Sequence, residues 1–310
     1  MTRRATFLRL ALAALVLLPG LAAAQVMYAA SLRSFANAGG QIVVGNLFTI
    51  NLGDGATKLL APIRLDNGTA VGITGLAVHP TDGAFYAITS GLSPDHPHSL
   101  VQIDPKTGNA KLIGALKARG SDIAFGPGGT LYIWIPGSRQ LGTVNLATGE
   151  VTALGAPGPQ TTAGGLAIDG NGIAYITPGG ASGTLDTVDR KSGAIATGPQ
   201  LSGAPYTSIN AMTFTPSGLL LAVNSNAGSP ALTRLVQINT STGQVAALVP
   251  LPDDTDAISF GPPHSLDIAA MLETMGGRML AVIALAVGSV LALLGVGIFS
   301  WRKRRHAAKP

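Results

Sequence analysis

The chain contains no cysteine among its 310 residues. This absence excludes a disulfide-stabilised scaffold, a thiolate metal site and a cysteine nucleophile. Aromatic residues are also scarce, at 5% of the sequence, which argues against a lectin that stacks sugars on exposed Trp and Tyr. Charged residues make up only 11%, yet a hydrophobic fraction of 46% is too high for a disordered chain.

Basic residues are scarce where a nucleic-acid-binding face would need them. The whole chain has a formal charge of +5, but residues 25–278 contain 12 Lys and Arg against all 15 Asp and Glu, a net charge of −3. The surplus of cations therefore lies at the two ends, where it marks targeting and topology. A nucleic-acid-binding face instead gathers cations within the folded part. The sequence predicts no nucleic-acid partner.

Residues 1–24 predict a secretory signal peptide. Three arginines precede the apolar run 10–18, and three alanines precede the predicted cleavage site before Gln25. The twin arginines Arg3-Arg4 leave the Tat route open, but two further residues separate them from Phe7-Leu8, so ordinary Sec export is favoured. The short signal and the Ala/Gly-rich composition indicate a bacterial protein.

Residues 279–299 predict a transmembrane helix. They form a run of 21 residues without a charge, and about 20 residues are enough to cross a hydrocarbon core as a helix. The sequence RKRR at 302–305 follows, so the positive-inside rule places the tail, residues 300–310, in the cytoplasm. We expect a single-span protein of the bacterial inner membrane, with residues 25–262 in the periplasm or at the cell exterior.

Residues 263–278 form the predicted juxtamembrane linker, which contains the pair Gly276-Gly277. This pair, the span and the Arg-rich end together resemble the tripartite GlyGly-CTERM sorting tails of bacterial surface proteins, which are cut and transferred. The length of the span favours permanent anchoring. Cleavage by a sortase-like enzyme stays open as an alternative.

One phrase recurs between the two membrane signals. It consists of two apolar strands around a turn rich in Pro, Gly, Asp or Asn, and its copies lie at 75–89, 122–135, 165–177 and 211–223. A fifth copy, DAISFGP at 256–262, ends after its first strand. The spacings are 47, 43, 46 and 46 residues between the equivalent positions Leu76, Ile123, Leu166, Met212 and Ile258. This period is typical of a four-stranded propeller blade.

A second phrase, a hairpin with glycine in its turn, follows each full copy of the first. The turn glycines, which supply a positive φ, are Gly108, Gly149, Gly193 and Gly243. A surplus hairpin at 48–62 precedes every copy of the first phrase, and residues 26–31 match the second strand at 85–90. We therefore expect the strand in 256–262 to be the innermost strand of a blade whose other strands come from the N-terminus.

These observations predict an all-β fold, a five-bladed β-propeller closed by N- and C-terminal strands that share one blade, plus one C-terminal transmembrane α-helix. A closed ring leaves no free edges in its central sheets. A β-sandwich with the same number of strands is the main alternative, but sandwiches do not repeat their sequence at a fixed period. An open solenoid would need capping repeats, and neither end of the repeat region carries one.

The repeated phrases resemble the loose bacterial propeller group with YVTN, NHL and SMP-30-like repeats. Blades of that group also contain an apolar strand, a Pro/Asp/Gly turn, a second strand and an IDpxTG-type hairpin. The resemblance covers roughly residues 26–262 and implies the propeller fold. It implies no single function, because the group includes lactonases, binding modules and scaffolds.

The residues that open the first strand of each blade are expected to form a ring at one mouth of the central channel. They are Thr74, Ser121, Gly164, Asn210 and Asp256, with Asp122 beside Ser121. We predict a ligand-binding site there. In SMP-30-like propellers an Asn or Asp before this strand contributes to a divalent-metal site, so the resemblance implies Asp122, Asn210 and Asp256 as ligands of a hard cation such as Ca²⁺. Polar residues at a water-filled mouth need no metal, so both interpretations stay open.

The sequence favours binding over catalysis. The lactonase pattern calls for Glu-Gly-Pro near the start of the mature chain, whereas the two glutamates are Glu150, in a hairpin turn, and Glu273, beside the predicted membrane span. The acids Asp122 and Asp256 come from blades that are not neighbours, so nothing local supports a paired-carboxylate site. No histidine is placed to serve a nucleophilic serine.

Two remaining features have ordinary explanations. The His96-Pro97-His98 motif has no third metal ligand nearby in the sequence, which favours a solvated loop. Trp134 is expected to pack between blades.

We predict a membrane-anchored extracytoplasmic propeller that acts as a binding or scaffold module, with a protein partner or a small ligand at one of its faces. The alternative is a metal-dependent hydrolase of the SMP-30/lactonase type with its site at the channel mouth.

Overall fold

The computed structural model describes residues 26–32, 35–36, 42–43, 45–178, 183–203, 208–225 and 233–261. All of them belong to one compact unit, Ala24–Pro262. The predicted signal peptide, linker, membrane span and cytoplasmic tail lie outside the described residues. Among the described residues, no helix combines the length and the apolar character that a membrane crossing requires.

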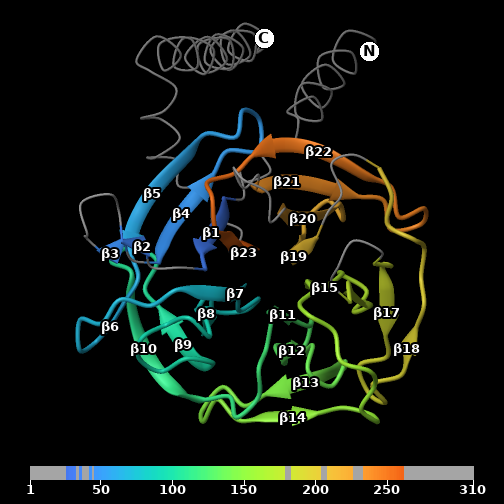
Figure 1. Ribbon diagram of the computed structural model, residues 1–310, viewed down its shortest axis with the longest axis horizontal. Helices are drawn as coiled ribbons and strands as arrows, with labels where there is room; N and C mark the ends of the chain where they lie inside the picture. Colours follow the sequence, from blue (N-terminus) through green and yellow to red (C-terminus); the bar gives the residue numbers. More distant parts are fainter. Residues whose placement is uncertain are drawn as a thin grey trace, which may run out of the picture. The chain divides into compact units, whose positions relative to one another are not determined.

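The described chain folds into five antiparallel blades arranged in a circle, which confirms the predicted five-bladed propeller (Figure 1). Named from the innermost strand outward, blade 1 contains β23 (Thr255–Phe260), β1 (Met27–Ser31), β4 (Asn46–Ile50) and β5 (Thr57–Pro62). Blade 2 contains β7 (Ile73–Val78), β8 (Phe85–Thr89), β9 (Ser99–Ile103) and β10 (Asn109–Ala115). Blade 3 contains β11 (Asp122–Phe125), β12 (Leu131–Ile135), β13 (Gln140–Val144) and β14 (Val151–Ala153). Blade 4 contains β15 (Leu166–Ile168), β16 (Ala174–Ile176), β17 (Asp186–Val188) and β18 (Ile195–Ala196). Blade 5 contains β19 (Ile209–Phe214), β20 (Leu220–Ser225), β21 (Thr233–Ile238) and β22 (Val245–Pro250).

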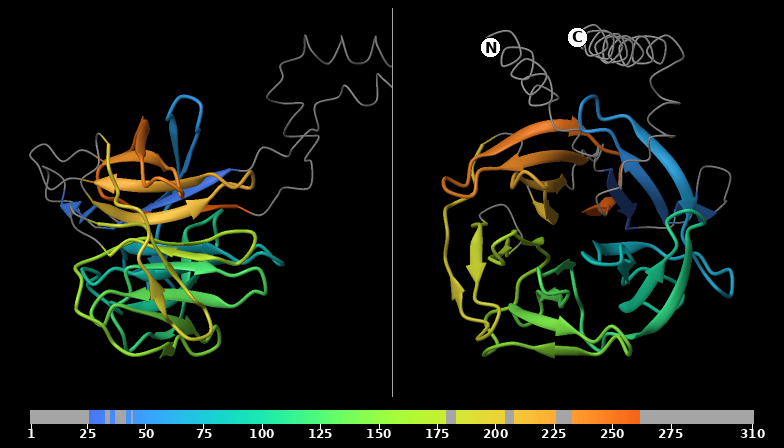
Figure 2. Two further views of the ribbon diagram at one scale, coloured as in Figure 1. Left: turned by 90° about the vertical axis from the view of Figure 1, so that its right-hand side faces the viewer. Right: turned by 180° about the vertical axis from the view of Figure 1, so that it is seen from behind.

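Blade 1 closes the ring in the way that the two surplus phrases predict. Its innermost strand β23 comes from the C-terminal end of the repeat region and pairs antiparallel with the N-terminal strand β1, with Ala29 opposite Ile258. On its other side β1 pairs with β4, where Ala29 lies opposite Phe48. The two ends of the propeller chain are therefore joined by backbone hydrogen bonds. The same circle of blades is seen from behind in Figure 2.

The core of the propeller is divided among the junctions between neighbouring blades. Within the described part, the buried apolar side chains form five clusters, and each cluster draws on two adjacent blades. Trp134 of blade 3 is fully buried and shares a cluster with Leu166 and Ile176 of blade 4, as predicted. Each blade is a twisted sheet that must bury both faces, so its inner strands are apolar on both sides.

Two strand pairings were not predicted from the sequence. The short strand β6 (Arg64–Leu65) pairs in parallel with the outer strand β10, which gives the sheet of blade 2 a fifth strand. Strands β2 (Phe35–Ala36) and β3 (Ile42–Val43) form a separate two-stranded sheet. These segments are too short to carry a repeat or a clear alternation, the two signals that identified the blades.

Candidate functional site

All five innermost strands run in the same direction, so equivalent residues meet at each end of the channel. We call the end where these strands begin the polar mouth and the end where they finish the apolar mouth. The ring residues predicted from the sequence lie at the polar mouth. They are Thr74 in β7, Ser121 just before β11, Gly164 before β15, Asn210 in β19 and Asp256 in β23.

Asp256 is the centre of the hydrogen bonds at the polar mouth. The Thr74 hydroxyl donates to its Oδ2 at 2.8 Å, and the Asn210 side-chain amide donates to its Oδ1 at 2.8 Å. The same amide lies 2.9 Å from the Ser225 hydroxyl oxygen. Blades 2, 5 and 1 supply Thr74, Asn210 and Asp256, so these bonds connect three consecutive blades.

Ser121 and Gly164 continue the ring through blades 3 and 4. The Ser121 hydroxyl donates to the carbonyl oxygen of Gly164 at 2.8 Å, and the Thr74 hydroxyl lies 3.3 Å from the carbonyl oxygen of Ser121. Gly164 has a φ of 148°, and a Cβ at this position would lie 1.8 Å from the carbonyl oxygen of Thr177. Thr177 directly follows β16 of the same blade, so only glycine fits at this position beside the end of β16. The structure brings all five predicted ring positions together.

Asp122 has a different place from its neighbour Ser121. Its side chain is fully buried, and its carboxylate accepts backbone N–H groups from Ile123, Leu166 and Met212 at 2.9, 2.8 and 3.0 Å. These donors belong to the innermost strands of blades 3, 4 and 5. Burial raises the pKa of Asp122 well above its usual range, the three N–H donors oppose this rise, and the charge of Asp256 adds to it. Asp122 thus joins three inner strands.

The hydrogen bonds also test how well these side chains suit a cation. Ca²⁺ takes about six to eight oxygen ligands in one shell. Here Asp122 is engaged by three backbone N–H groups, and Asp256 is engaged by Thr74 and Asn210. No group of three His, Cys, Asp or Glu side chains within the described ranges is placed to hold a metal ion. The arrangement of Asp122, Asn210 and Asp256 does not favour Ca²⁺, which stays a prediction from the resemblance.

A cavity of about 430 Å³ opens at the polar mouth, and we call it the mouth cavity. Four ring residues, Thr74, Ser121, Asn210 and Asp256, line it. Loop residues complete its wall, and they are Leu32, Ser90, Gly91, Leu92, His98, Arg119, Gly120, Pro136, Thr162 and Ala163. This volume lies within the range of about 300–1,000 Å³ that is usual for small-molecule sites.

The sequence did not identify the loop residues of the mouth cavity. Ser90 and His98 come from the loop between β8 and β9, and Arg119 comes from the loop before β11. Their positions follow from loop conformations that no periodic pattern records. The order of the strands was the one available signal. In a propeller, the loop between the second and third strands of a blade and the loop before the next blade both lie at the polar mouth, so residues of these loops were candidates for the cavity wall.

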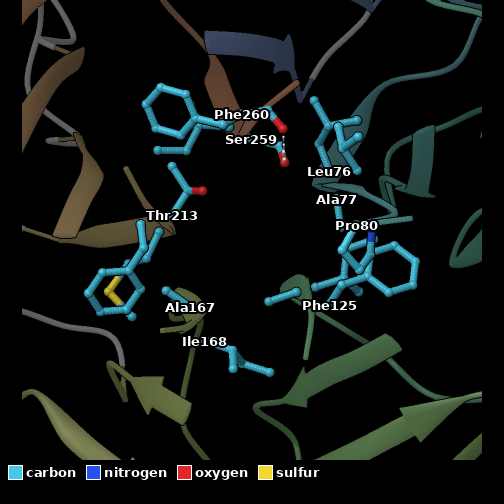
Figure 3. Close-up of a pocket in the computed structure, with 15 residues that line it drawn as sticks. Leu76, Ala77, Pro80, Phe125, Ala167, Ile168, Thr213, Ser259 and Phe260 are labelled. Atoms are coloured by element: carbon cyan, nitrogen blue, oxygen red, sulfur yellow. Dashed lines mark hydrogen bonds between the residues drawn. The ribbon is translucent and has the colours of Figure 1, made fainter. Parts of the chain in front are cut away.

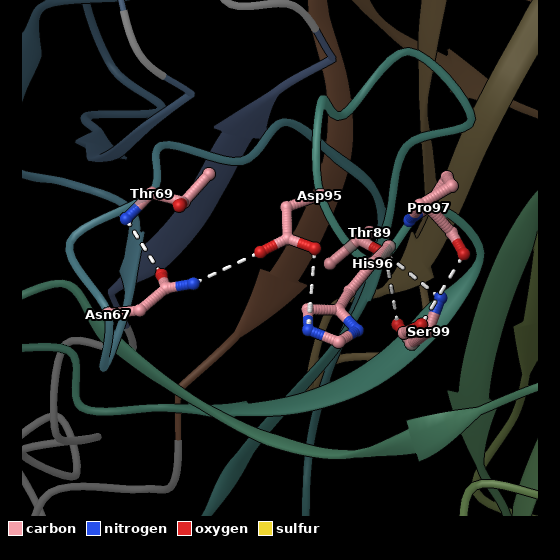
Figure 4. A network of polar contacts seen from close by, with 7 residues as sticks. All are labelled: Asn67, Thr69, Thr89, Asp95, His96, Pro97 and Ser99. Carbon is pink, nitrogen blue, oxygen red and sulfur yellow. Dashed lines mark hydrogen bonds and ion pairs between the residues drawn. The ribbon is translucent and has the colours of Figure 1, made fainter.

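The His96-Pro97-His98 motif does not bring its two histidines to a common centre. His96 Nε2 lies 3.4 Å from Asp95 Oδ1, and the Asn67 side-chain amide donates to Asp95 Oδ2 at 3.0 Å (Figure 4). His98 instead lines the mouth cavity. The loop is held at its base, where the Ser99 backbone N–H donates to the Thr89 hydroxyl oxygen at 2.9 Å. The motif therefore shapes the cavity wall.

The apolar mouth has a smaller cavity of about 170 Å³ (Figure 3). The last residues of the innermost strands line it, and they are Val78, Phe125, Ile168, Phe214 and Phe260. Its lining contains no charged side chain, and its polar residues are Thr213 and Ser259. The two ends of the channel thus differ in chemistry, and the hydrogen-bonding groups gather at the polar mouth.

Comparisons with known proteins return folds of propeller type and no family. No family model matches the chain, and no curated protein matches it. A structure titled as a nidogen/laminin complex is 12% identical with a TM-score of 0.48, covering 76% of this chain and 97% of that one. A protein of unknown function from Bacteroides caccae is 11% identical with a TM-score of 0.48, covering 76% and 98%. A structural genomics protein of unknown function from Bacteroides thetaiotaomicron is 15% identical with a TM-score of 0.43, covering 59% and 52%. Function is therefore argued from the site residues.

Proposed function

We propose that this protein is a membrane-anchored, extracytoplasmic β-propeller that binds a small ligand or a protruding group of a partner protein in its mouth cavity. The observation that carries the proposal is the cavity of about 430 Å³, whose wall combines hydrogen-bonding, charged and apolar side chains. Such a mixture fixes the orientation of a ligand and also buries its apolar surface.

The hydrogen bonds in the mouth cavity support binding over catalysis. The hydroxyls of Thr74 and Ser121 donate to Asp256 and to the backbone of Gly164, and neither contacts a histidine. The hydroxyl–histidine pairing that commonly activates a serine or threonine nucleophile is therefore not found among these described contacts. The described lining therefore favours a site that binds a ligand without transforming it. The metal-dependent hydrolase is the second candidate, and the test below distinguishes binding from hydrolysis.

Anchoring is proposed from the sequence, and the position of the chain ends agrees with an accessible polar mouth. Met27 lies opposite Phe260, so both described ends of the propeller chain lie at the apolar mouth. Protease added to spheroplasts should remove the propeller and spare a tag placed after Pro310, whereas the reverse pattern would contradict the proposed topology.

The binding function is tested by blocking the mouth cavity. Full-length protein in detergent would be screened by thermal shift against a library of small metabolites. A ligand at a hundredfold excess over its Kd adds about 2.7 kcal/mol to the free energy of unfolding. For a domain of this size, that gain raises the melting temperature by about 5–10 °C.

Two tryptophan variants locate the site. Ala163→Trp fills the mouth cavity and should abolish the shift, whereas Thr213→Trp places the same side chain at the apolar mouth and should preserve it. A library without stabilising compounds, or hits that persist in Ala163→Trp, would contradict the proposal. Turnover of a lactone with Ca²⁺ that is lost in Asp256→Ala would instead establish the hydrolase.

A further inference from the structure

The wall of the mouth cavity carries a cation that no described residue of the propeller engages. Arg119 lines the cavity, its side chain is exposed, and it makes no hydrogen bond or ion pair with the other described residues. Lys117, two residues earlier, offers a contrast because its Nζ pairs with Glu150 Oε1 at 2.5 Å. An unengaged guanidinium at a concave site presents a planar fork of donors that matches a carboxylate.

His98 stands beside Arg119 and contributes a neutral hydrogen-bonding group. Burial lowers the pKa of His98, and the positive charge of Arg119 lowers it further, so the imidazole is neutral at pH 7. Its Nδ1 is buried and has no hydrogen-bond partner among the described residues. The ring is held against Gly91, where a Cβ would lie 2.6 Å from His98 Cε1. The wall therefore offers one cation and one neutral polar ring.

Apolar and acidic residues limit what else the ligand can carry. Leu92 lines the mouth cavity with 63% of its surface exposed, so it presents apolar surface to a ligand. Leu32, Pro136 and Ala163 add apolar surface to the same wall. Asp256, only 7% exposed, also lines the cavity, and its carboxylate accepts hydrogen bonds from Thr74 and Asn210. A second anionic group on the ligand would be buried against this apolar surface at a cost, so a ligand with a single carboxylate fits the wall better.

We propose that the mouth cavity binds a small organic monocarboxylate with an apolar body, whose carboxylate is held by Arg119 while its body packs on Leu92. The inference rests on the proposed binding function and names its ligand class. The carboxylate comes either from a free acid or from the C-terminus of a peptide, and the probes below distinguish these two sources.

The test is isothermal titration of full-length protein in detergent with matched pairs of probes. Hexanoate and phenylacetate represent free acids, and a short peptide ending in leucine represents a chain terminus. Each is paired with its primary amide, and adipate serves as the dicarboxylate. We expect the acids to bind at least about tenfold more tightly than their amides, since a hydrogen bond to a charged group contributes about 1.5–3 kcal/mol. Hexanoate should also bind more tightly than adipate.

Variants assign the binding to Arg119. Arg119→Gln should weaken carboxylate binding about 10- to 100-fold, and Arg119→Lys should restore part of it because the charge remains without the fork. Lys117→Gln is the matched control, since it removes a cation from the same loop that does not line the mouth cavity. Its affinities should equal those of the wild type. Ala163→Trp should abolish binding and thereby exclude partition into the detergent.

Three results would overturn the inference. They are acids that bind no more tightly than their amides, acids that bind equally to Arg119→Gln, and an absence of carboxylate binding. If uncharged compounds bind and Ala163→Trp blocks them, the binding function stands and the ligand class is wrong. If the cavity-blocking variant changes nothing for any compound, the proposed function fails as well.

Discussion

At the scale of single residues, Asp122 shows how one buried carboxylate stabilises the centre of the ring. Sequence alignment of the repeats placed it beside the mouth residues, one position after Ser121. Adjacent residues of a strand point to opposite sides, however, so a shift of one position moves a side chain to the other side of the strand. Thr74 and Asp256 line the mouth cavity, whereas Asp122 reaches the backbones of two other inner strands.

We expect Asp122→Ala to destabilise the propeller strongly. Three buried N–H groups would lose their acceptor, and each unsatisfied buried donor costs about 1–3 kcal/mol. Removing the carboxyl group also removes the cost of burying it, which offsets part of this loss. The free energy of unfolding should therefore fall by about 3 kcal/mol, which lowers the melting temperature by about 6–12 °C. Asp66→Ala, which removes an exposed carboxylate, is the control and should change the melting temperature by less than about 2 °C.

The effect of Asp122→Ala should also depend on pH. The fold raises the pKa of Asp122, so the folded state keeps this proton at pH values where the unfolded chain has lost it. The stability of the wild type therefore falls as pH rises from the unfolded pKa, about 3.9, through the raised value in the fold. Because the variant lacks this group, its loss of free energy of unfolding relative to the wild type should be larger at pH 5 than at pH 8. A loss of free energy of unfolding that grows with pH would contradict the raised pKa of Asp122 in the fold.

At the scale of elements, the hairpins hold neighbouring blades together through glycine. The turn glycines Gly108, Gly149, Gly193 and Gly243 have φ values of 76°, 77°, 74° and 73°, as their positions in the second phrase predicted. Each also lies against the preceding blade. A Cβ on Gly193, for example, would lie 2.4 Å from the carbonyl oxygen of Leu154, just after β14. The glycines thus serve both the turn and the junction between blades.

Two glycine variants separate these roles. Gly218 has a φ of 85°, but no atom lies within 4 Å of the point that a Cβ would occupy, so Gly218→Ala measures backbone strain alone, about 1–2 kcal/mol. Gly193→Ala adds a clash with backbone atoms of blade 3. We expect its loss of stability in denaturant titration to exceed that of Gly218→Ala by at least about 1 kcal/mol. Equal losses would mean that the hairpin does not hold the two blades together.

The elements also show where sequence reasoning succeeds. The five innermost strands and the composite blade were predictable because apolar alternation and a repeated turn are local signals. The ring positions Thr74, Asn210 and Asp256 followed from aligning those strands. The wall residues His98 and Arg119 did not, since each reaches the mouth cavity through a loop whose course depends on contacts distant in sequence. The strands β6, β2 and β3 were missed because they are too short to carry a repeat or an alternation.

At the scale of the whole molecule, stability depends on closing the circle. After blade 5 the chain enters β23, which belongs to blade 1, so the first and last described strands of the propeller must pair before the ring of inner strands is complete. The junction of blades 5 and 1 has its own apolar cluster, which includes Met27, Leu235 and Ile258. Separation of β1 from β23 would expose this cluster and two unpaired strand edges.

A disulfide between β1 and β23 tests this closure. Ala30 and Ala257 are paired across the two strands and are fully buried, and the chain contains no other cysteine to compete. Paired residues of antiparallel strands have Cα atoms about 4.5–5.5 Å apart, within the range that a disulfide bridges. In the chain-entropy account, closing a loop of this length contributes about 5 kcal/mol. We expect the oxidised Ala30→Cys, Ala257→Cys protein to melt at least about 5 °C above its reduced form, because engineered bonds deliver only part of that gain. Each single variant should melt at the same temperature with and without reductant. Disulfide-linked dimers in place of the intramolecular bond, or an unchanged melting temperature after quantitative oxidation, would show that the two strands do not hold the ring closed.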